Sequence, residues 1–234
     1  MVVLPTYNEA GNLANMVGEL FALGLDLEVL VVDDNSPDGT GRIADELSAQ
    51  HPGKVHVMHR EGKLGLGTAY VAGFKFALER GVDRIVQMDA DFSHAPDRLP
   101  VFLSLIEEEG CDVVVGSRYV AGGKLDEKWG FWRRFLSGMG NRYAALVTGL
   151  PQRDVTAGFK CYTREALSAL PLDQIRSNGY AFQIEVSFLC HRAGLSVRES
   201  PIHFEDRVIG NSKMSTAIIL EAMWRVWQII WRYR

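Results

Sequence analysis

Two aspartates in the first half of the chain are spaced as ligands of a divalent cation. Asp89 and Asp91 follow an apolar run at residues 84–86 that is typical of a short buried strand. Residues i and i+2 of an extended backbone point to the same side, so both carboxylates can reach one ion. Mg²⁺ and Mn²⁺ are commonly held by one or two carboxylates together with phosphate oxygens. Such an ion can bridge a diphosphate and stabilise the charge on a departing nucleotide, although the pair alone also fits a solvated turn.

Polar side chains follow other predicted strands as well. Tyr7 and Glu9 follow the first strand, where tyrosine can stack on a base and glutamate can accept hydrogen bonds from its amino groups. Asp33 and Asp34 end the second strand, and two carboxylates there repel one another unless a ligand or metal uses them. Arg118 ends the fifth strand, and its planar fork of donors suits a phosphate.

The elements that must position these residues alternate along the chain. Strands are predicted over residues 2–4, 28–32, 55–58, 84–88 and 112–116, and helices over residues 9–21, 40–50, 67–79 and 97–108. This alternation predicts an α/β fold with a Rossmann-like, mainly parallel sheet flanked by helices. Ligands of such sheets bind beyond the carboxyl ends of the strands, which is where the candidate residues lie.

Composition limits the class of protein. The chain has 234 residues, 47% of them hydrophobic, as in a globular protein with a substantial core. The net charge of −4 argues against a nucleic-acid partner. Cys111, Cys161 and Cys190 are too scattered for a disulfide framework, and we expect buried thiols in a reducing compartment. We expect no helix that spans a bilayer, because the sequence has no apolar run of about 20 residues.

Six blocks of the sequence together resemble one enzyme family. They are residues 3–9, 32–40, 88–94, 116–119, 153–160 and 207–214. In this order and spacing they resemble the family 2 GT-A glycosyltransferases, and among these the dolichol-phosphate (polyprenol-phosphate) mannosyltransferases. The resemblance covers nearly the whole chain and implies a GT-A fold.

The resemblance implies an inverting transfer of mannose from GDP-mannose to a polyprenyl (dolichyl) phosphate, with Mg²⁺ or Mn²⁺ as cofactor. Asp89 and Asp91 would hold the metal and, with Arg118, form the catalytic set. The residues implied to bind the nucleotide sugar are Pro5, Tyr7, Glu9, Asp33, Asp34, Asp89, Ala90, Asp91, Arg207 and Lys213. Those implied to meet the acceptor phosphate are Arg118, Arg133, Arg134 and Ser137. Some relatives have a glutamine metal ligand where this chain has Ser93, a poorer ligand.

A phosphate acceptor changes what the chemistry requires. Hydroxyl acceptors need a general base, whereas a phosphate monoester is mostly dianionic near neutral pH because its second pKa is about 6. The enzyme then needs positive charge to bring two anions together. Asp154, the base in relatives with hydroxyl acceptors, is expected to have only a positioning role.

Two segments are expected at a membrane surface. Residues 1–214 are predicted to form the GT-A catalytic domain, which includes an amphipathic interface helix over residues 129–149, and residues 215–234 a membrane-interface helix. The tryptophans all fall in these two helices, at Trp129, Trp132, Trp224, Trp227 and Trp231. Polar residues form one narrow stripe on the last helix, at Glu221, Arg225, Gln228 and Arg232. A core helix is the competing interpretation, but tryptophan together with arginine favours a bilayer interface.

The expected protein is therefore cytoplasmic and peripheral on the cytosolic face of a membrane. Its expected partners are GDP-mannose, the polyprenyl phosphate and the membrane surface, and a membrane-anchoring subunit or domain is a further candidate. Three other functions stay open: a UDP-glucose-dependent enzyme using the same lipid, a family 2 transferase to a saccharide hydroxyl, and a non-catalytic membrane-binding scaffold. A donor screen, a pH profile of acceptor use and a test of metal-dependent nucleotide binding distinguish these.

Overall fold

The computed structural model describes residues 1–205 and 216–233, with side chains of the last helix described from residue 223 onward. Within these ranges, a seven-stranded sheet has the order β3-β2-β1-β4-β7-β5-β8, and β6 pairs with β9 separately. The strands are β1 (Val2–Thr6), β2 (Val29–Asp33), β3 (Val55–His59), β4 (Arg84–Gln87), β5 (Val113–Ser117), β6 (Lys124–Leu125), β7 (Lys160–Thr163), β8 (Val197–Pro201) and β9 (His203–Phe204). The predicted mainly parallel α/β sheet is confirmed.

The sheet departs from a parallel order at β7, which pairs antiparallel with β4 on one side and β5 on the other. The remaining pairings within the large sheet are parallel in the described residues. β7 arises from residues 152–200, a stretch whose sequence pattern is mixed. The central strands are buried on both faces, which is why runs such as that of β2 contain apolar residues at successive positions.

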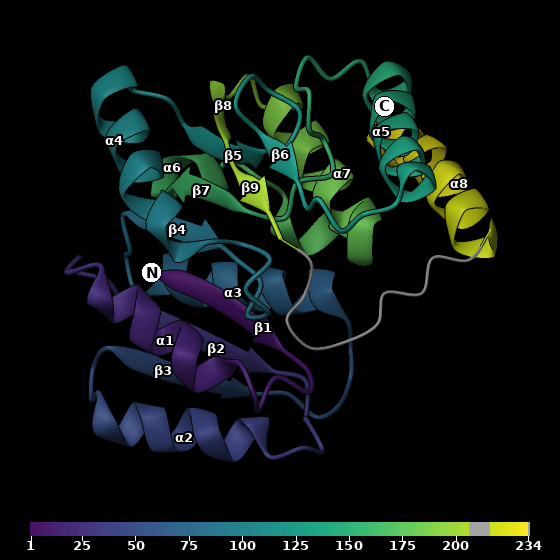
Figure 1. The fold of residues 1–234 in the computed structure, drawn as a ribbon. Coiled ribbons are helices and arrows are strands. Elements are labelled where there is room, and N and C mark those ends of the chain that lie inside the picture. Colours follow the sequence, from purple (N-terminus) through teal and green to yellow (C-terminus); the bar gives the residue numbers. More distant parts are fainter. Residues whose placement is uncertain (206–215, 234) are drawn as a thin grey trace.

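Helices cover both faces of the sheet (Figure 1). They are α1 (Leu13–Ala22), α2 (Thr40–Gln50), α3 (Leu66–Glu79), α4 (Leu99–Glu109), α5 (Phe131–Thr148), α6 (Arg164–Ser168), α7 (Gly179–Arg192) and α8 (Thr216–Arg232), with 3₁₀ turns η1 (Pro96–Arg98) and η2 (Leu172–Gln174). Apolar side chains of α1, α2 and α4 pack on one face of the sheet, and those of α3, α6 and α7 pack on the other.

The first strand and first helix differ from the prediction. Pro5 does not end the strand, because β1 continues through it to Thr6 in register with β2. Its missing N–H faces the β4 side, where pairing has already ended at Val3. The helix begins at Leu13 rather than at residue 9. The backbone N–H groups of residues 8–10 instead donate to Ser36 and Asp38 of the loop after β2 and to Thr40 at the start of α2.

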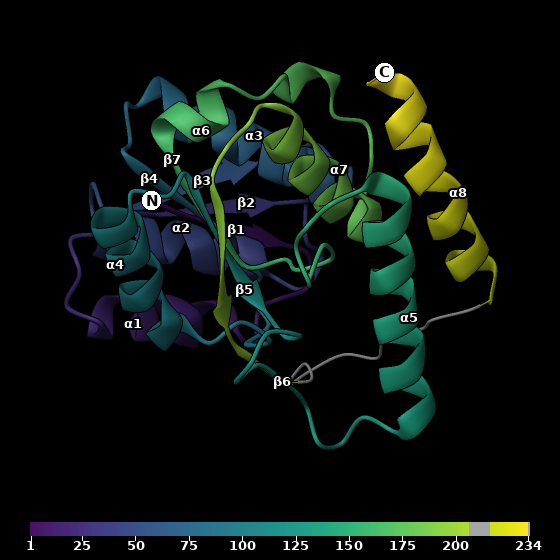
Figure 2. The same ribbon diagram turned by 90° about the horizontal axis from the view of Figure 1, so that it is seen from above.

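The helices α5 and α8 lie side by side at one end of the molecule, next to α7 (Figure 2). Val226, Ile229 and Tyr233 of α8 are buried in the same core cluster as α7. Arg232 forms an ion pair of 2.8 Å with the buried Glu185 of α7. Part of the last helix therefore belongs to the core, and the predicted domain boundary at residue 214 lies outside the described residues. No helix among the described residues is long and apolar enough to cross a bilayer.

Candidate functional site

The carboxyl ends of β1 and β2 bring Asp33 into a network of neutral donors. Its Oδ1 accepts hydrogen bonds from the Thr6 hydroxyl at 3.0 Å and the Ser36 hydroxyl at 2.6 Å. Its Oδ2 accepts from the Ser36 N–H at 3.0 Å. Because Asp33 is also buried, its carboxylate is held in one orientation at the edge of the sheet.

The neighbouring Asp34 is held by a cation. Arg60 approaches Asp34 Oδ1 to 2.7 Å, and both side chains are buried. The N–H of Gly65 donates to Asp34 Oδ2 at 2.9 Å. The ion pair offsets the repulsion between the adjacent carboxylates, so a ligand is not required to explain the pair. The assignment of both acids to the nucleoside remains a prediction.

The other residues predicted to bind the nucleotide-sugar donor lie at the same edge of the sheet. The Lys63 ammonium lies 3.9 Å from the centroid of the Tyr7 ring, which is the surface on which a base would stack. The Glu9 carboxylate accepts a hydrogen bond of 2.8 Å from Asn12. Pro5 lies within β1, between Leu4 and Thr6, and is half-buried. A base stacking on this face of Tyr7 must displace Lys63 or share the ring with it.

The loop after β4 carries the two candidate metal ligands. Asp91 Oδ1 accepts from the N–H of Ser93 at 3.0 Å and from its hydroxyl at 2.6 Å. Ser93 thus orients Asp91 and uses its hydroxyl hydrogen in doing so. Ala90 is buried between the two aspartates, and Phe92 has a φ of +63°, which turns the chain sharply after Asp91.

Asp89 is anchored through both its backbone and its side chain. Its N–H donates to His94 Nδ1 at 3.0 Å, and its Oδ1 accepts from the Tyr70 hydroxyl at 2.6 Å. Burial, followed by the Asp89 charge, raises the pKa of Tyr70 well above its usual value. The phenol therefore remains the donor in this pair at neutral pH.

The donor set at this loop suits a hard cation that also binds substrate. The described residues contain no cluster of three or more histidine, cysteine, aspartate or glutamate side chains that could hold a metal. Two carboxylates completed by diphosphate oxygens match the way Mg²⁺ is usually held beside a nucleotide. The residues present therefore fit such an ion.

Arg118 forms a buried pair with Asp154. Its Nε and Nη2 donate to the two carboxylate oxygens, each at 2.8 Å, and Nη2 also donates to the Thr156 hydroxyl at 2.8 Å. Burial alone would raise the pKa of Asp154, but the Arg118 charge and hydrogen bonds outweigh it and lower that pKa. Asp154 is thus held as a carboxylate by Arg118, and the positioning role expected for it stays a prediction.

The same pair limits what Arg118 can offer a phosphate. Its planar fork of Nε and Nη2 is turned to Asp154, and we had expected that fork to face the acceptor. In the described part of the chain, Nη1 takes part in no hydrogen bond. Arg118 is therefore a single-atom donor to a phosphate in this structure, and its contact with the acceptor stays a prediction.

The remaining acceptor candidates line α5. Arg133 lies over the Trp129 ring at 3.9 Å, Arg134 donates to the carbonyl of Asp126 at 2.9 Å, and the Ser137 hydroxyl lies 2.9 Å from that of Tyr119. Trp129 is only 9% exposed, so the expectation that it faces a membrane is wrong; it packs edge-on against Phe204 instead. Arg207 and Lys213 lie outside the described residues.

Several residues of the site were not found from the sequence. Arg60 and Tyr70 hold Asp34 and Asp89, and Asn141 of α5 accepts from the N–H of Val155 at 2.9 Å and donates to the carbonyl of Arg153. Of these residues, only Tyr70 could have been suspected from the sequence. It lies in the apolar stripe of a helix, and a buried phenol needs a hydrogen-bond partner.

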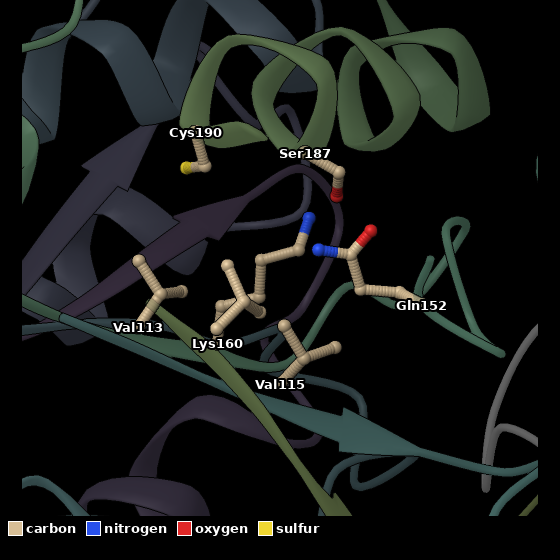
Figure 3. Close-up of a pocket in the computed structure, with 7 residues that line it drawn as sticks. Val113, Val115, Gln152, Lys160, Ser187 and Cys190 are labelled. Atoms are coloured by element: carbon tan, nitrogen blue, oxygen red, sulfur yellow. The ribbon is translucent and has the colours of Figure 1, made fainter. Parts of the chain in front are cut away.

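A buried polar layer lies beneath the loop of Asp89. Gln87 of β4 donates to Gln183 Oε1 at 2.6 Å, and Lys160 Nζ donates to the same oxygen at 3.0 Å. Figure 3 shows Lys160, Gln152 and Ser187 directed into one small space between β5 and α7. Burial lowers the pKa of Lys160 to about 8. The space is lined by Val113, Val115, Gln152, Lys160, Ser187, Cys190 and Val197, none of which is a predicted site residue.

Comparisons of the sequence with known proteins find relatives over nearly the whole chain. Residues 1–170 match the model of "Glycosyl transferase family 2". The chain is 46% identical over 226 residues to polyprenol monophosphomannose synthase of Mycolicibacterium smegmatis, covering 97% of this chain and 84% of that protein. It is 45% identical over 223 residues to undecaprenyl-phosphate mannosyltransferase of Micrococcus luteus, covering 95% and 90%.

Solved structures share the fold at lower identity. Glucosyl-3-phosphoglycerate synthase from Mycobacterium tuberculosis, in complex with Mn²⁺, UDP and glucosyl-3-phosphoglycerate, has a TM-score of 0.65 at 21% identity, covering 99% of this chain and 77% of that one. Mannosyl-3-phosphoglycerate synthase from Rubrobacter xylanophilus has a TM-score of 0.66 at 20% identity, covering 99% and 72%.

Proposed function

This chain belongs to glycosyl transferase family 2, and from that premise we propose that it transfers mannose from GDP-mannose to a polyprenyl phosphate. The transfer inverts the configuration at the anomeric carbon of the sugar and uses Mg²⁺ or Mn²⁺. The observation that carries the proposal is the identity, over nearly the whole chain, with two proteins named for polyprenol and undecaprenyl phosphate mannosylation. The acidic edge of the sheet supports the donor half of the reaction.

In this mechanism Asp89 and Asp91 would hold the divalent cation, which neutralises charge on the diphosphate as the sugar departs. Tyr7, Glu9 and the Asp33–Asp34 pair would bind the nucleoside. Arg118 would offer its remaining Nη1 at the junction of donor and acceptor, and Asp154 would fix its orientation. No general base is needed, because a phosphate acceptor is already mostly dianionic near neutral pH.

The acceptor half of the proposal rests on an exposed apolar surface. We define the interface face as the large exposed apolar side chains of α5 and α8, which are Phe131, Trp132, Phe135, Leu136, Met139, Leu146, Met223, Trp224, Trp227 and Trp231. Trp132 is 71% exposed and Trp231 is 54% exposed. Such a surface, flanked by arginines, suits the headgroup region of a bilayer, where a polyprenyl phosphate is presented. We therefore assign the protein to the cytosolic face of a membrane.

One assay tests the donor, the acceptor and the metal together. Radiolabelled GDP-mannose and UDP-glucose are each offered with a short polyprenyl phosphate, with and without EDTA. We expect a lipid-linked product from GDP-mannose alone, and none in EDTA. A lipid-linked product from UDP-glucose would show that the donor is UDP-glucose rather than GDP-mannose. Full activity in EDTA would show that no metal is required. Transfer to a saccharide hydroxyl with no transfer to the lipid phosphate would overturn the proposal.

A further inference from the structure

We infer that Tyr70 of α3 is a positioning residue for the divalent cation, acting through Asp89. The inference deepens the proposed function and rests on its metal-dependent donor site. Tyr70 lies on α3, a helix that contains no residue predicted to belong to the donor site.

The contact between the two residues is short and its donor is immobile. The Tyr70 hydroxyl lies 2.6 Å from Asp89 Oδ1, within the range of a charge-assisted O–H···O⁻ bond. Tyr70 is fully buried, and its ring is stacked on Phe182 with centroids 5.7 Å apart and an angle of 6° between the planes. A phenol packed in this way offers the carboxylate a fixed point of attachment.

This attachment orients the Asp89 carboxylate and leaves Oδ2 without a hydrogen bond among the described residues. Oδ1 is committed to Tyr70, and the N–H of Asp89 is committed to His94 Nδ1 at 3.0 Å. Among the described residues, Oδ2 accepts no hydrogen bond. Asp89 is therefore held by two anchors with Oδ2 left to bind a cation, which is how hydrogen-bonded second partners orient metal ligands.

The helix that carries Tyr70 also contacts the nucleoside end of the site. The residue before α3, Gly65, donates its N–H to Asp34 Oδ2 at 2.9 Å. Gly67 lies so close to the loop before α7 that a Cβ would come within 2.3 Å of the Ser177 carbonyl oxygen. This close packing fixes the start of α3, so one rigid helix sets the position of an acid for the nucleoside and an acid for the metal.

A purely structural role for the phenol is the competing interpretation, since any buried hydroxyl needs a partner. The chain supplies a matched control in Tyr162, which is equally buried and donates to Gln87 Oε1 at 3.0 Å. Both hydroxyls lie near the end of β4, but only that of Tyr70 reaches a candidate metal ligand. Removing either hydroxyl costs one buried hydrogen bond, which goes to a carboxylate for Tyr70 and to a neutral amide for Tyr162.

The test compares the full-length proteins carrying Tyr70→Phe and Tyr162→Phe. Calorimetric titration of GDP with and without Mn²⁺, and electron paramagnetic resonance of bound Mn²⁺ with GDP present, give the metal affinity without any turnover. We expect Tyr70→Phe to weaken Mn²⁺ binding by about 10- to 100-fold, the usual effect of removing the partner of a metal ligand. Tyr162→Phe should bind Mn²⁺ as the wild type does, although it also loses a buried hydrogen bond and its Tm should fall.

A double-mutant cycle with Asp89→Asn completes the test. In that background Tyr70→Phe should have no further effect on Mn²⁺ affinity, because the group on which it acts is gone. Unchanged Mn²⁺ affinity in Tyr70→Phe, or equal losses in the two tyrosine variants, would overturn the inference alone. A wild type whose GDP binding ignores Mn²⁺ would instead overturn the metal site of the proposed function.

Discussion

At the edge of the sheet that would bind the donor, Asp33, Asp34, Asp89 and Asp91 each accept hydrogen bonds from neighbouring groups. The large apolar side chains of the interface face are exposed on α5 and α8. A polar site gains from being fixed before the ligand arrives, since its dipoles then need no rearrangement. A surface that meets lipid gains from exposed aromatic rings, which adapt to a fluid partner.

This contrast predicts that changes at the donor edge act on every acceptor, whereas changes at the interface face act only on acceptors presented in a membrane. In the Arg118–Asp154 pair, Arg118 lies directly after β5, and Asn141 joins the loop of Asp154 to α5. Variants at the donor edge, at the Arg118–Asp154 pair and at the interface face test which of these places affects every acceptor and which affects only acceptors in a membrane.

The largest effect is expected for Asp91→Asn. The substitution removes a charge from the candidate metal site but can retain the hydrogen bonds with Ser93. Turnover should fall by at least about 100-fold with both short and long acceptors, because the diphosphate loses its cation. Initial rates with the two acceptors measure this, and an unchanged Tm shows that the fold is intact. A near-normal rate would remove Asp91 from the metal site.

The next effect concerns the junction. Asp154→Asn leaves the Arg118 guanidinium buried without its counter-charge, so the free energy of unfolding should fall by about 3–5 kcal/mol. The pKa of Asp154 is lowered in the folded protein, so its contribution is present above the ordinary pKa near 4 and is lost as the pH falls through the folded value.

Urea unfolding at neutral and acidic pH measures this contribution. The wild type should lose stability below about pH 4, and the variant should lack that part of the acid dependence. The exposed Asp97 supplies the control, since Asp97→Asn should leave unfolding at neutral pH nearly unchanged. If both variants behave alike, the pair does not hold the junction together.

A smaller effect is expected beneath the donor edge. Lys160 has a folded pKa of about 8, below its usual value, so between pH 8 and its unfolded pKa the unfolded chain binds more protons and stability rises with pH. Lys160→Met should flatten the rise of stability with pH. It should also increase the free energy of unfolding at pH 7 by on the order of 1–3 kcal/mol, because an ammonium no longer has to be buried. Thermal unfolding at pH 7 and pH 9.5 checks both, and a variant less stable than the wild type at pH 7 would contradict the prediction.

The smallest effect should be selective. The double variant Trp132→Ser, Trp231→Ser should weaken binding to anionic vesicles by about 10-fold, equivalent to about 1.4 kcal/mol, and slow transfer to long-chain acceptors. Transfer to a short water-soluble acceptor should stay near normal. Val101→Ser, in an exposed apolar position of α4, is the control. Equal losses with both acceptors would place these tryptophans in the core.

The predictable parts of the molecule are those that depend on local pattern. The first five strands were located within two residues because each is a compact apolar run. The partners of the acids could not be located, since Arg60 and Tyr70 come from other elements and meet Asp34 and Asp89 only in the folded sheet. Trp129 was misplaced for the same reason: its burial depends on Phe204, which lies far along the chain.

The antiparallel strand β7 has a consequence for how the chain must fold. β4 and β5 are complete by Ser117, but the strand that lies between them begins at Lys160. Until that segment arrives, two central edges with unpaired N–H and C=O groups face each other across an empty position, which is the kind of surface that recruits other chains. Sheet closure should therefore be a late, non-local step, and ribosome-bound chains ending before residue 160 should be those most dependent on chaperones.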